Sequence, residues 1–148
     1  MTKTRTGQPV APDLLERVRS RFRDFPLTRD WPLAIQSLGP GQATLHLDPS
    51  EHTTNGPGGA MNGGVLATLA DIACAMALCT HFDGRMPFAT SDLHIRYLEP
   101  AVTRVQAEAS VIRASPRSAI LECRLLADGR VVGLATALFA IRQRATQE

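Results

Sequence analysis

The longest apolar run of the chain lies between Ala60 and Phe82, and it contains a single acidic residue, Asp71. The run is rich in Ala and Leu, lacks proline and follows paired glycines, which predicts a helix. Apolar residues cover nearly every face of this helix, as in a helix that is buried all round or spans a membrane. We expect the run to be too short for a membrane span, and we interpret it as the core helix of a soluble domain.

The N-terminal part predicts a loose segment followed by a short helix. Residues 1–11 are polar and are expected to be loose. Over residues 12–25 the apolar positions recur at intervals of four, four and three, which is one helical stripe. The stripe consists of Leu14, Val18, Phe22 and Phe25. Arginines also recur in this helix, and we interpret them as a solvated face; they are Arg17, Arg19, Arg21 and Arg23.

Alternation of apolar and polar residues predicts six strands around the long helix. Two strands, at residues 31–38 and 42–48, form a hairpin before the helix. Four follow it, at 88–98, 102–112, 118–126 and 131–141, and the last two are joined by an Asp-Gly turn. The final strand is apolar on both faces, as a central strand would be. We expect one α+β domain over residues 1–148, with an additional N-terminal helix.

Composition narrows the function classes. The chain has 148 residues, is 44% hydrophobic and has a net charge of +2, which fits one globular domain. No basic run is interleaved with aromatic residues, and this argues against a nucleic-acid partner. The three cysteines show no metal-ligand spacing, and they indicate small core residues in a reducing compartment. No apolar leader is present, and we expect a cytoplasmic protein without a membrane partner.

Asp71 is the candidate for chemistry, because a carboxylate in an apolar helix is costly unless it is paired or faces a wet cleft. It could hydrogen-bond neighbouring backbone, or it could be a general base or nucleophile. The loop before the helix, residues 53–62, is long, polar and glycine-rich, and such loops are commonly functional. No Gly-Lys-Ser/Thr follows these glycines, which excludes a phosphate-binding loop of that type. His46 and Asp48 alternate on a wet strand face and are not expected to be catalytic.

The element order, with a buried helix wrapped by one antiparallel sheet, resembles the hotdog fold. The stretch MNGGVLATLADIACAMAL is similar to the signature of the phenylacetyl-CoA thioesterase (PaaI-like) family, in which His-Gly-Gly opens the helix and an acid follows seven residues after the second glycine. Gly63, Gly64 and Asp71 match this pattern, whereas Asn62 stands where most members carry His. The segments EHTTN, ATSDLHIRYLEPA and DGRVVGLATALFAI extend the resemblance over residues 31–142.

The resemblance implies a site for hydrolysis of an acyl-CoA thioester. Asp71 would act as general base on water, or as a nucleophile through an anhydride, and the sequence leaves both open. Gly64 would bring a backbone N–H to the thioester oxygen at the positive end of the helix dipole. Asn55 and Asn62 would orient the water or the carbonyl, and Thr90 would hold the water from the partner subunit's side. A turn or core-edge role remains open for each of these residues.

The resemblance also implies the ligands and the assembly. The site would lie between two subunits of a homodimer that pairs again to a tetramer. Gly63 and Thr68 are candidate substrate contacts, and Arg113 and Arg117 are candidates for the phosphates of coenzyme A, because guanidinium groups pair well with phosphate. We expect no metal and no separate cofactor, since coenzyme A is part of the substrate. The acyl group would be aryl or a short or medium chain.

Two other hypotheses stay open at this point. The first is a non-catalytic hotdog module that binds acyl-CoA, which Asn62 in place of His favours and the retained Asp71 disfavours. The second is a hotdog dehydratase, which would use a His and an acid together. No His lies where the long helix begins, and we rank the dehydratase last.

Overall fold

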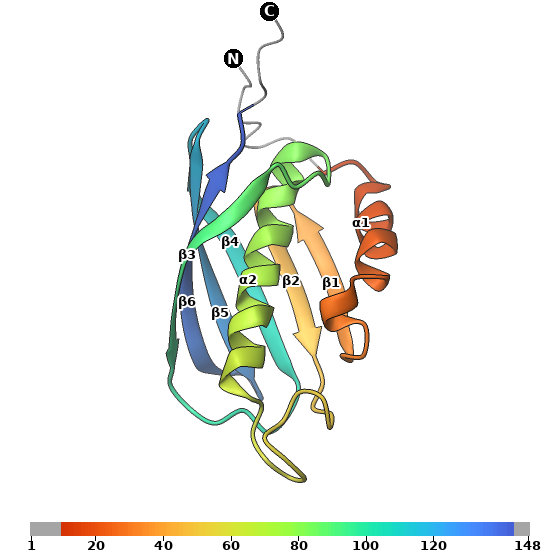
Figure 1. The fold of residues 1–148 in the computed structure, drawn as a ribbon, viewed down its shortest axis with the longest axis vertical. Helices are drawn as coiled ribbons and strands as arrows, with labels where there is room; N and C mark the ends of the chain where they lie inside the picture. Colours follow the sequence, from red (N-terminus) through yellow and green to blue (C-terminus); the bar gives the residue numbers. More distant parts are fainter. Residues whose placement is uncertain (1–9, 144–148) are drawn as a thin grey trace, which may run out of the picture.

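The computed structural model describes residues 10–143, which form a six-stranded antiparallel sheet with a long helix lying along one face (Figure 1). The strands lie in the order β1-β2-β4-β5-β6-β3. Their bounds are β1 Leu33–Gly39, β2 Gln42–Leu47, β3 Phe88–Tyr97, β4 Val105–Ala114, β5 Ser118–Ala127 and β6 Arg130–Ile141. The helices are α1 Leu14–Arg23, α2 Gly63–Cys79 and the short 3-10 helices η1 Pro26–Thr28 and η2 Thr80–Phe82. The predicted hotdog fold, with β6 as an interior strand, is confirmed.

The N-terminal helix is shorter than the predicted span of 12–25. It starts at Leu14 and ends at Arg23. Phe25 has an extended backbone, with φ −70° and ψ 115°, because a residue before proline is driven out of the helical region. Phe25 therefore belongs to the turn into η1 rather than to the helix. Most of the segment predicted to be loose, residues 1–9, lies outside the described residues.

Strand β4 is displaced from its predicted span of 102–112 and runs over Val105–Ala114. Before it, the Arg104 guanidinium binds both carboxylate oxygens of Asp48, at 2.7 and 2.8 Å. This hydrogen bonding holds the pKa of Asp48 below its ordinary value and gives Asp48 a structural role. Near the other end, the pairing of β4 with β5 shifts between Val111 and Arg113. Such a bulge breaks the alternation of apolar and polar positions, which is why the sequence pattern missed the end of the strand.

The central helix is a core helix, as predicted, although our expectation about its length was wrong. With η2 it forms a segment of 20 residues, Gly63–Phe82, which is long and apolar enough to cross a membrane. Its buried side chains are Leu66, Leu69, Ala70, Ile72, Ala73, Cys74, Met76, Ala77, Leu78 and Cys79. Three positions spaced by three and four residues, Thr68, Asp71 and Ala75, are only half-buried. One narrow stripe of α2 is thus left partly uncovered.

His81, in η2, packs beside the turn between β1 and β2. Its Nδ1 atom is buried and has no hydrogen-bond partner among residues 10–143. A Cβ atom added to Gly41 would lie 3.1 Å from Nε2 of this imidazole, so the turn approaches the ring closely. Burial lowers the pKa of His81 below its ordinary value of 6.5.

The first prediction concerns this histidine. In the unfolded chain the His81 imidazole binds a proton near pH 6.5, whereas in the folded chain it binds one only at lower pH. The contribution of neutral His81 to the free energy of unfolding should therefore be complete above pH 6.5. It should fall as the pH drops from there through the lowered pKa. Denaturant titrations from pH 7.5 to 5 should show this loss in the wild type and a weaker loss in His81→Phe. The exposed His52→Phe should keep the wild-type slope, and an equal slope in His81→Phe would contradict the assignment.

Candidate active site

Asp71 lies in the middle of α2, on the stripe that the sheet does not cover. The hydroxyl of Thr90, on β3, donates a hydrogen bond to its Oδ1 atom at 2.7 Å. Among residues 10–143, Thr90 is the one hydrogen-bond donor to the Asp71 carboxylate. The Oδ2 atom of Asp71 is therefore free to accept a further hydrogen bond. Asp71 is therefore anchored by a side chain and not by neighbouring backbone. We expected Thr90 to act from the partner subunit's side, whereas this contact is made within one chain.

The start of α2 is organised by the side chain of Asn62. Its Oδ1 accepts hydrogen bonds from the backbone N–H groups of Gly64, at 2.8 Å, and Val65, at 3.3 Å. Its Nδ2 donates to Oδ1 of Asn55 at 2.8 Å, which ties the preceding loop to the helix. Asn62 is thus an N-cap, a role in which asparagine is among the preferred residues. The Gly64 N–H predicted to face a substrate oxygen is occupied by this cap.

Both glycines of the pair have neighbours that a side chain would disturb. A Cβ atom on Gly63 would lie 3.3 Å from the ring of Tyr97, and the Tyr97 hydroxyl donates to the Gly63 carbonyl. A Cβ atom on Gly64 would lie 3.1 Å from Oδ1 of Asn62. The sequence did not single out Tyr97, because it continues the apolar alternation of Leu93 and Ile95 on its strand. The sequence feature that could have drawn attention to Tyr97 is that it is the one tyrosine of the chain.

Gly64, Thr68 and Asp71 form one row along α2. Gly64 and Asp71 are seven residues apart, which is close to two helical turns and about 10 Å of rise. Between them the Thr68 hydroxyl donates to the Gly64 carbonyl at 2.9 Å, so its proton is used within the helix. At this separation one small acyl group cannot contact the Gly64 N–H and the Asp71 carboxylate of the same chain together. Gly64 and Asp71 thus lie on the same face of α2, but they are too far apart to act on one thioester carbonyl.

The two arginines suggested for coenzyme A phosphates lie elsewhere in the same chain. Arg113 is near the end of β4 and Arg117 is in the hairpin between β4 and β5. This hairpin lies at the upper end of the sheet in Figure 1. That end adjoins the C-terminal end of α2, because the Gly41 N–H donates to the Thr80 hydroxyl at 2.9 Å. Thr80 is nine residues beyond Asp71, or about 13 Å along a helix. The structure thus does not bring these arginines to Asp71 within one chain.

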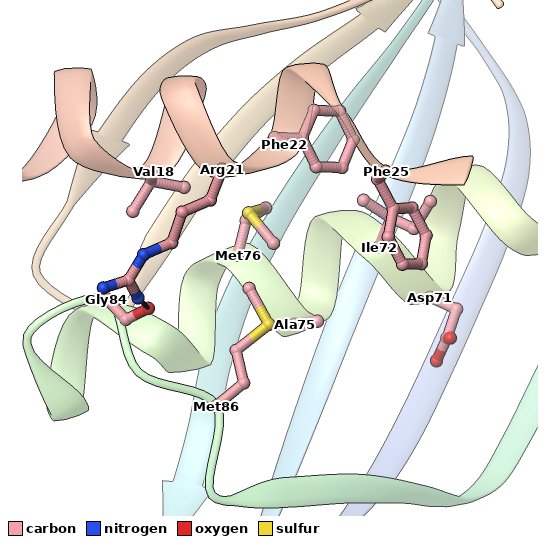
Figure 2. A pocket seen from close by; sticks show the side chains of 10 residues that line it. All are labelled: Val18, Arg21, Phe22, Phe25, Asp71, Ile72, Ala75, Met76, Gly84 and Met86. Atoms are coloured by element: carbon pink, nitrogen blue, oxygen red, sulfur yellow. Dashed lines mark hydrogen bonds between the residues drawn. The ribbon is translucent and has the colours of Figure 1, made fainter. Parts of the chain in front are cut away.

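A groove between α1 and α2 reaches Asp71, as Figure 2 shows. It has a volume of about 420 Å³, and its walls carry Phe22, Phe25, Ile72, Met76 and Met86. The arginines of α1 were interpreted as a solvated face, and all four are exposed, although two of them also donate to carbonyls of distant elements. Arg19 donates to the carbonyls of Ile35 and Gln36, and Arg21 donates to the carbonyl of Gly84 at 3.3 Å. Sequence periodicity marks the buried stripe of α1 but does not show which element it faces.

Thiol and metal chemistry find no support among residues 10–143. Cys74, Cys79 and Cys123 are free and buried. A hydrogen bond with Cys123 and burial raise the pKa of the Cys74 thiol, and burial raises the pKa of Cys79 to about 12. Such thiols are poor nucleophiles at neutral pH, because the thiolate is the reactive form. Within the described range no three His, Cys, Asp or Glu side chains are grouped so that they could hold a metal ion.

Comparison with known proteins gives a consistent result. Residues 58–134, which include α2 and the catalytic candidates Asn62, Gly64, Asp71 and Thr90, match the model of the family described as the thioesterase superfamily. A relative from Halobacterium salinarum, named as an inferred esterase, is 31% identical over 116 residues, which are 76% of this chain and 77% of that protein.

Solved structures agree in fold. A mutant of the phenylacetic acid degradation protein PaaI from Thermus thermophilus is 27% identical, with a TM-score of 0.70, covering 80% of this chain and 100% of that chain. The PaaI protein of E. coli is 18% identical with a TM-score of 0.78, covering 90% of this chain and 96% of that chain. The second likeness concerns the fold alone.

The second prediction tests the cap at the start of α2. Asn62→Ala removes the acceptor for two helix N–H groups and should lower the free energy of unfolding by roughly 0.5–2 kcal/mol. Asn62→Asp keeps the acceptor for the helix N–H groups but loses the donor to Asn55, so it should lose less stability than Asn62→Ala. Both are measured by denaturant unfolding at one fixed protein concentration, because association would shift the apparent stability. Equal stability of Asn62→Ala and the wild type would show that the observed hydrogen bonds are not stabilising.

Proposed function

The chain belongs to the thioesterase superfamily and is a thioester hydrolase of the hotdog fold, and from this premise we propose that it hydrolyses acyl-CoA thioesters with Asp71 as the catalytic carboxylate. The observation that carries the proposal is the environment of Asp71. It is the one acid of an apolar helix, one of its oxygens is held by Thr90, the other is free, and it borders an apolar groove. A helix that served only to pack the core would not need a carboxylate with a free oxygen beside an apolar groove.

The proposed reaction uses few groups, because a thioester is already activated. In one route, Oδ2 of Asp71 accepts a proton from a water molecule while the water oxygen attacks the carbonyl carbon. The tetrahedral intermediate collapses, the C–S bond breaks, and the thiolate of coenzyme A takes up a proton. In the other route, Oδ2 itself attacks, the thiolate leaves, and water hydrolyses the resulting anhydride. In both, the hydrogen bond from Thr90 fixes the carboxylate orientation.

The oxyanion donor in this proposal comes from a second copy of the chain. About 10 Å separates Gly64 from Asp71 along one helix, and the same-chain residues cannot share one carbonyl. Two copies with antiparallel central helices would bring the start of each α2 to the Asp71 of the other. A bound thioester oxygen would then replace the Asn62 cap as the acceptor of the Gly64 N–H, at the positive end of the helix dipole.

The sheet edges support this assembly. Edge strand β1 is shielded by Arg19, which donates to the Ile35 and Gln36 carbonyls. Edge strand β3 lies at the other end of the sheet, beside the uncovered stripe of α2, and is available for pairing. On the opposite face of the sheet, three partly exposed apolar residues form a second surface that supports a tetramer; they are Ile120, Leu134 and Leu138.

We assign the remaining candidates within the same proposal. Gly63 and Thr68 flank the path of the thioester on α2. Arg113 and Arg117 would reach the phosphates of coenzyme A only from another copy, since they lie beyond the far end of the helix. The substrate would be an aryl or a short to medium acyl-CoA, in keeping with the similarity to a phenylacetic acid degradation protein. A cytoplasmic enzyme without cofactor or metal remains our prediction.

A second candidate function is a non-catalytic module that binds acyl-CoA. The observation in its favour is the Gly64 N–H, which already binds the Asn62 cap and is not open to a substrate oxygen. A binding module would retain acyl-CoA with a measurable Kd but release no thiol. Turnover by the wild type separates the two functions.

The third prediction concerns the carboxylate. Asp71→Asn keeps the shape of the side chain but removes its basicity and charge, so kcat should fall by roughly 10²–10⁴-fold. The measurement is release of free thiol from a panel of aryl, short and medium acyl-CoAs. Asp92→Asn, the same change at an exposed position of β3, is the control and should retain wild-type turnover. An Asp71→Asn variant with near wild-type kcat would refute the catalytic assignment.

The fourth prediction concerns the assembly. Sedimentation velocity at micromolar concentration should show a dimer or tetramer, because the proposed site needs two copies. Mixing two inactive variants gives a sharper test. The variants are Asp71→Asn and Gly64→Pro, whose proline lacks the N–H. When the two variants assemble with each other, turnover should be partly restored. One of the two sites of such a mixed dimer combines the intact Asp71 of one copy with the intact Gly64 N–H of the other. A stable monomer with full activity would contradict the two-copy site.

A further inference from the structure

We infer that the groove between α1 and α2 holds the acyl part of the substrate and that Arg21 limits the length of that acyl group. The preferred acyl groups would then be apolar and would end before the guanidinium. This inference rests on the proposed function, because it takes Asp71 as the reacting carboxylate. The groove volume of about 420 Å³ lies within the roughly 300–1,000 Å³ of small-molecule sites.

The groove begins where the chemistry is proposed to occur. Asp71 and Ala75 lie one turn apart on α2, and both line the groove together with α1. Figure 2 shows Asp71 at one end of the row of lining side chains and Arg21 with Gly84 at the other. The Asp71 side chain extends away from α1, toward Thr90 on β3. An acyl group whose carbonyl sits beside this carboxylate can therefore extend into the groove without displacing it.

The walls of the groove present apolar surface that the chain itself does not cover. Phe25 and Met86 are 44% and 48% exposed, although both are large apolar side chains that line the cavity. Phe22 stacks on Phe25 with ring centroids 6.4 Å apart, which gives one wall a flat aromatic surface. Methionines line the groove as well, and their flexible side chains adapt to ligands of different shape. Burial of this surface against a hydrocarbon chain or ring is favourable.

Arg21 closes the far end. One of its nitrogen atoms donates to the Gly84 carbonyl, and no carboxylate among residues 10–143 forms an ion pair with it. Gly84 is held close to α1, since a Cβ atom there would lie 2.9 Å from Leu14. A hydrocarbon chain that reached the guanidinium would remove its water without supplying hydrogen bonds, which is unfavourable. Longer acyl groups should thus be rejected at this point.

The test is a chain-length profile of kcat/KM on unbranched acyl-CoAs from acetyl to palmitoyl. The wild type should be most active on medium chains and fall for long ones. Arg21→Met replaces the charge by an apolar side chain and should raise the long-to-medium ratio by about tenfold or more. Ala75→Leu fills the middle of the groove and should lower the medium-to-short ratio by about 10- to 200-fold, the usual range for a filled or emptied apolar pocket.

Arg23→Met is the matched control, because this residue is two positions further along α1 and does not line the groove. Its profile should equal that of the wild type. Unchanged profiles in both Arg21→Met and Ala75→Leu would overturn the inference while leaving thioester hydrolysis intact. Weakened dimers with an unchanged profile would overturn it too and would identify the groove as a contact between copies. If the wild type hydrolyses none of these acyl-CoAs, the proposed function itself is rejected.

Discussion

Ten side chains of α2 are buried, most of them against the sheet, and this packing decides where every polar group of the site can lie. A polar side chain on these buried faces would lose its contact with water, which is costly unless it finds a hydrogen-bond partner. The strands β2, β4 and β5 lie behind the helix, β3 lies along one side and α1 along the other (Figure 1). Only the narrow strip of α2 between β3 and α1 can therefore carry a carboxylate that meets a substrate.

Asp71 occupies that strip, and its surroundings divide into a polar and an apolar side. Toward β3 it accepts a hydrogen bond from Thr90, and toward α1 it borders the groove. The hydrogen bond offsets part of the cost of removing a carboxylate from water, and the free oxygen retains the ability to accept a proton. The polar side suits the reacting atoms of a thioester, and the apolar side suits its acyl group. Catalysis and acyl recognition would thus meet at one residue.

In the proposed site, the side chain of Asn62 would set stability against catalysis at the start of α2. Its amide oxygen satisfies the Gly64 N–H, a contact worth about 1 kcal/mol as a helix cap. One preorganised donor to an oxyanion is worth about 3–4 kcal/mol in the transition state. If Gly64 is the oxyanion donor that we propose, exchange of the cap for a substrate oxygen would be favourable in the transition state, even though the resting N–H is occupied. In this view the amide protects the donor until the substrate binds.

Sequence pattern alone determined the element order, the six strands, the core helix and the placement of Gly64 and Asp71 on one face. These features depend on periodicity and local spacing, which a chain carries without any knowledge of its neighbours. The tertiary structure decided the partners. Thr90 meets Asp71 across 19 positions of sequence, whereas Arg113 and Arg117 lie beyond the other end of the helix.

The groove between α1 and α2 was also decided by the tertiary structure. The sequence pattern predicts the apolar stripe of α1, but it does not show that this stripe faces α2. Arg21 was predicted to lie on a solvated face and it is exposed, but periodicity could not show that it also donates to the carbonyl of Gly84. Likewise the cap formed by Asn62 follows from the extended backbone before α2, with φ −62° and ψ 137°, which aims its side chain at the first helix N–H groups. Local sequence fixes which face of an element is apolar, but contacts between distant elements depend on how those elements cross in space.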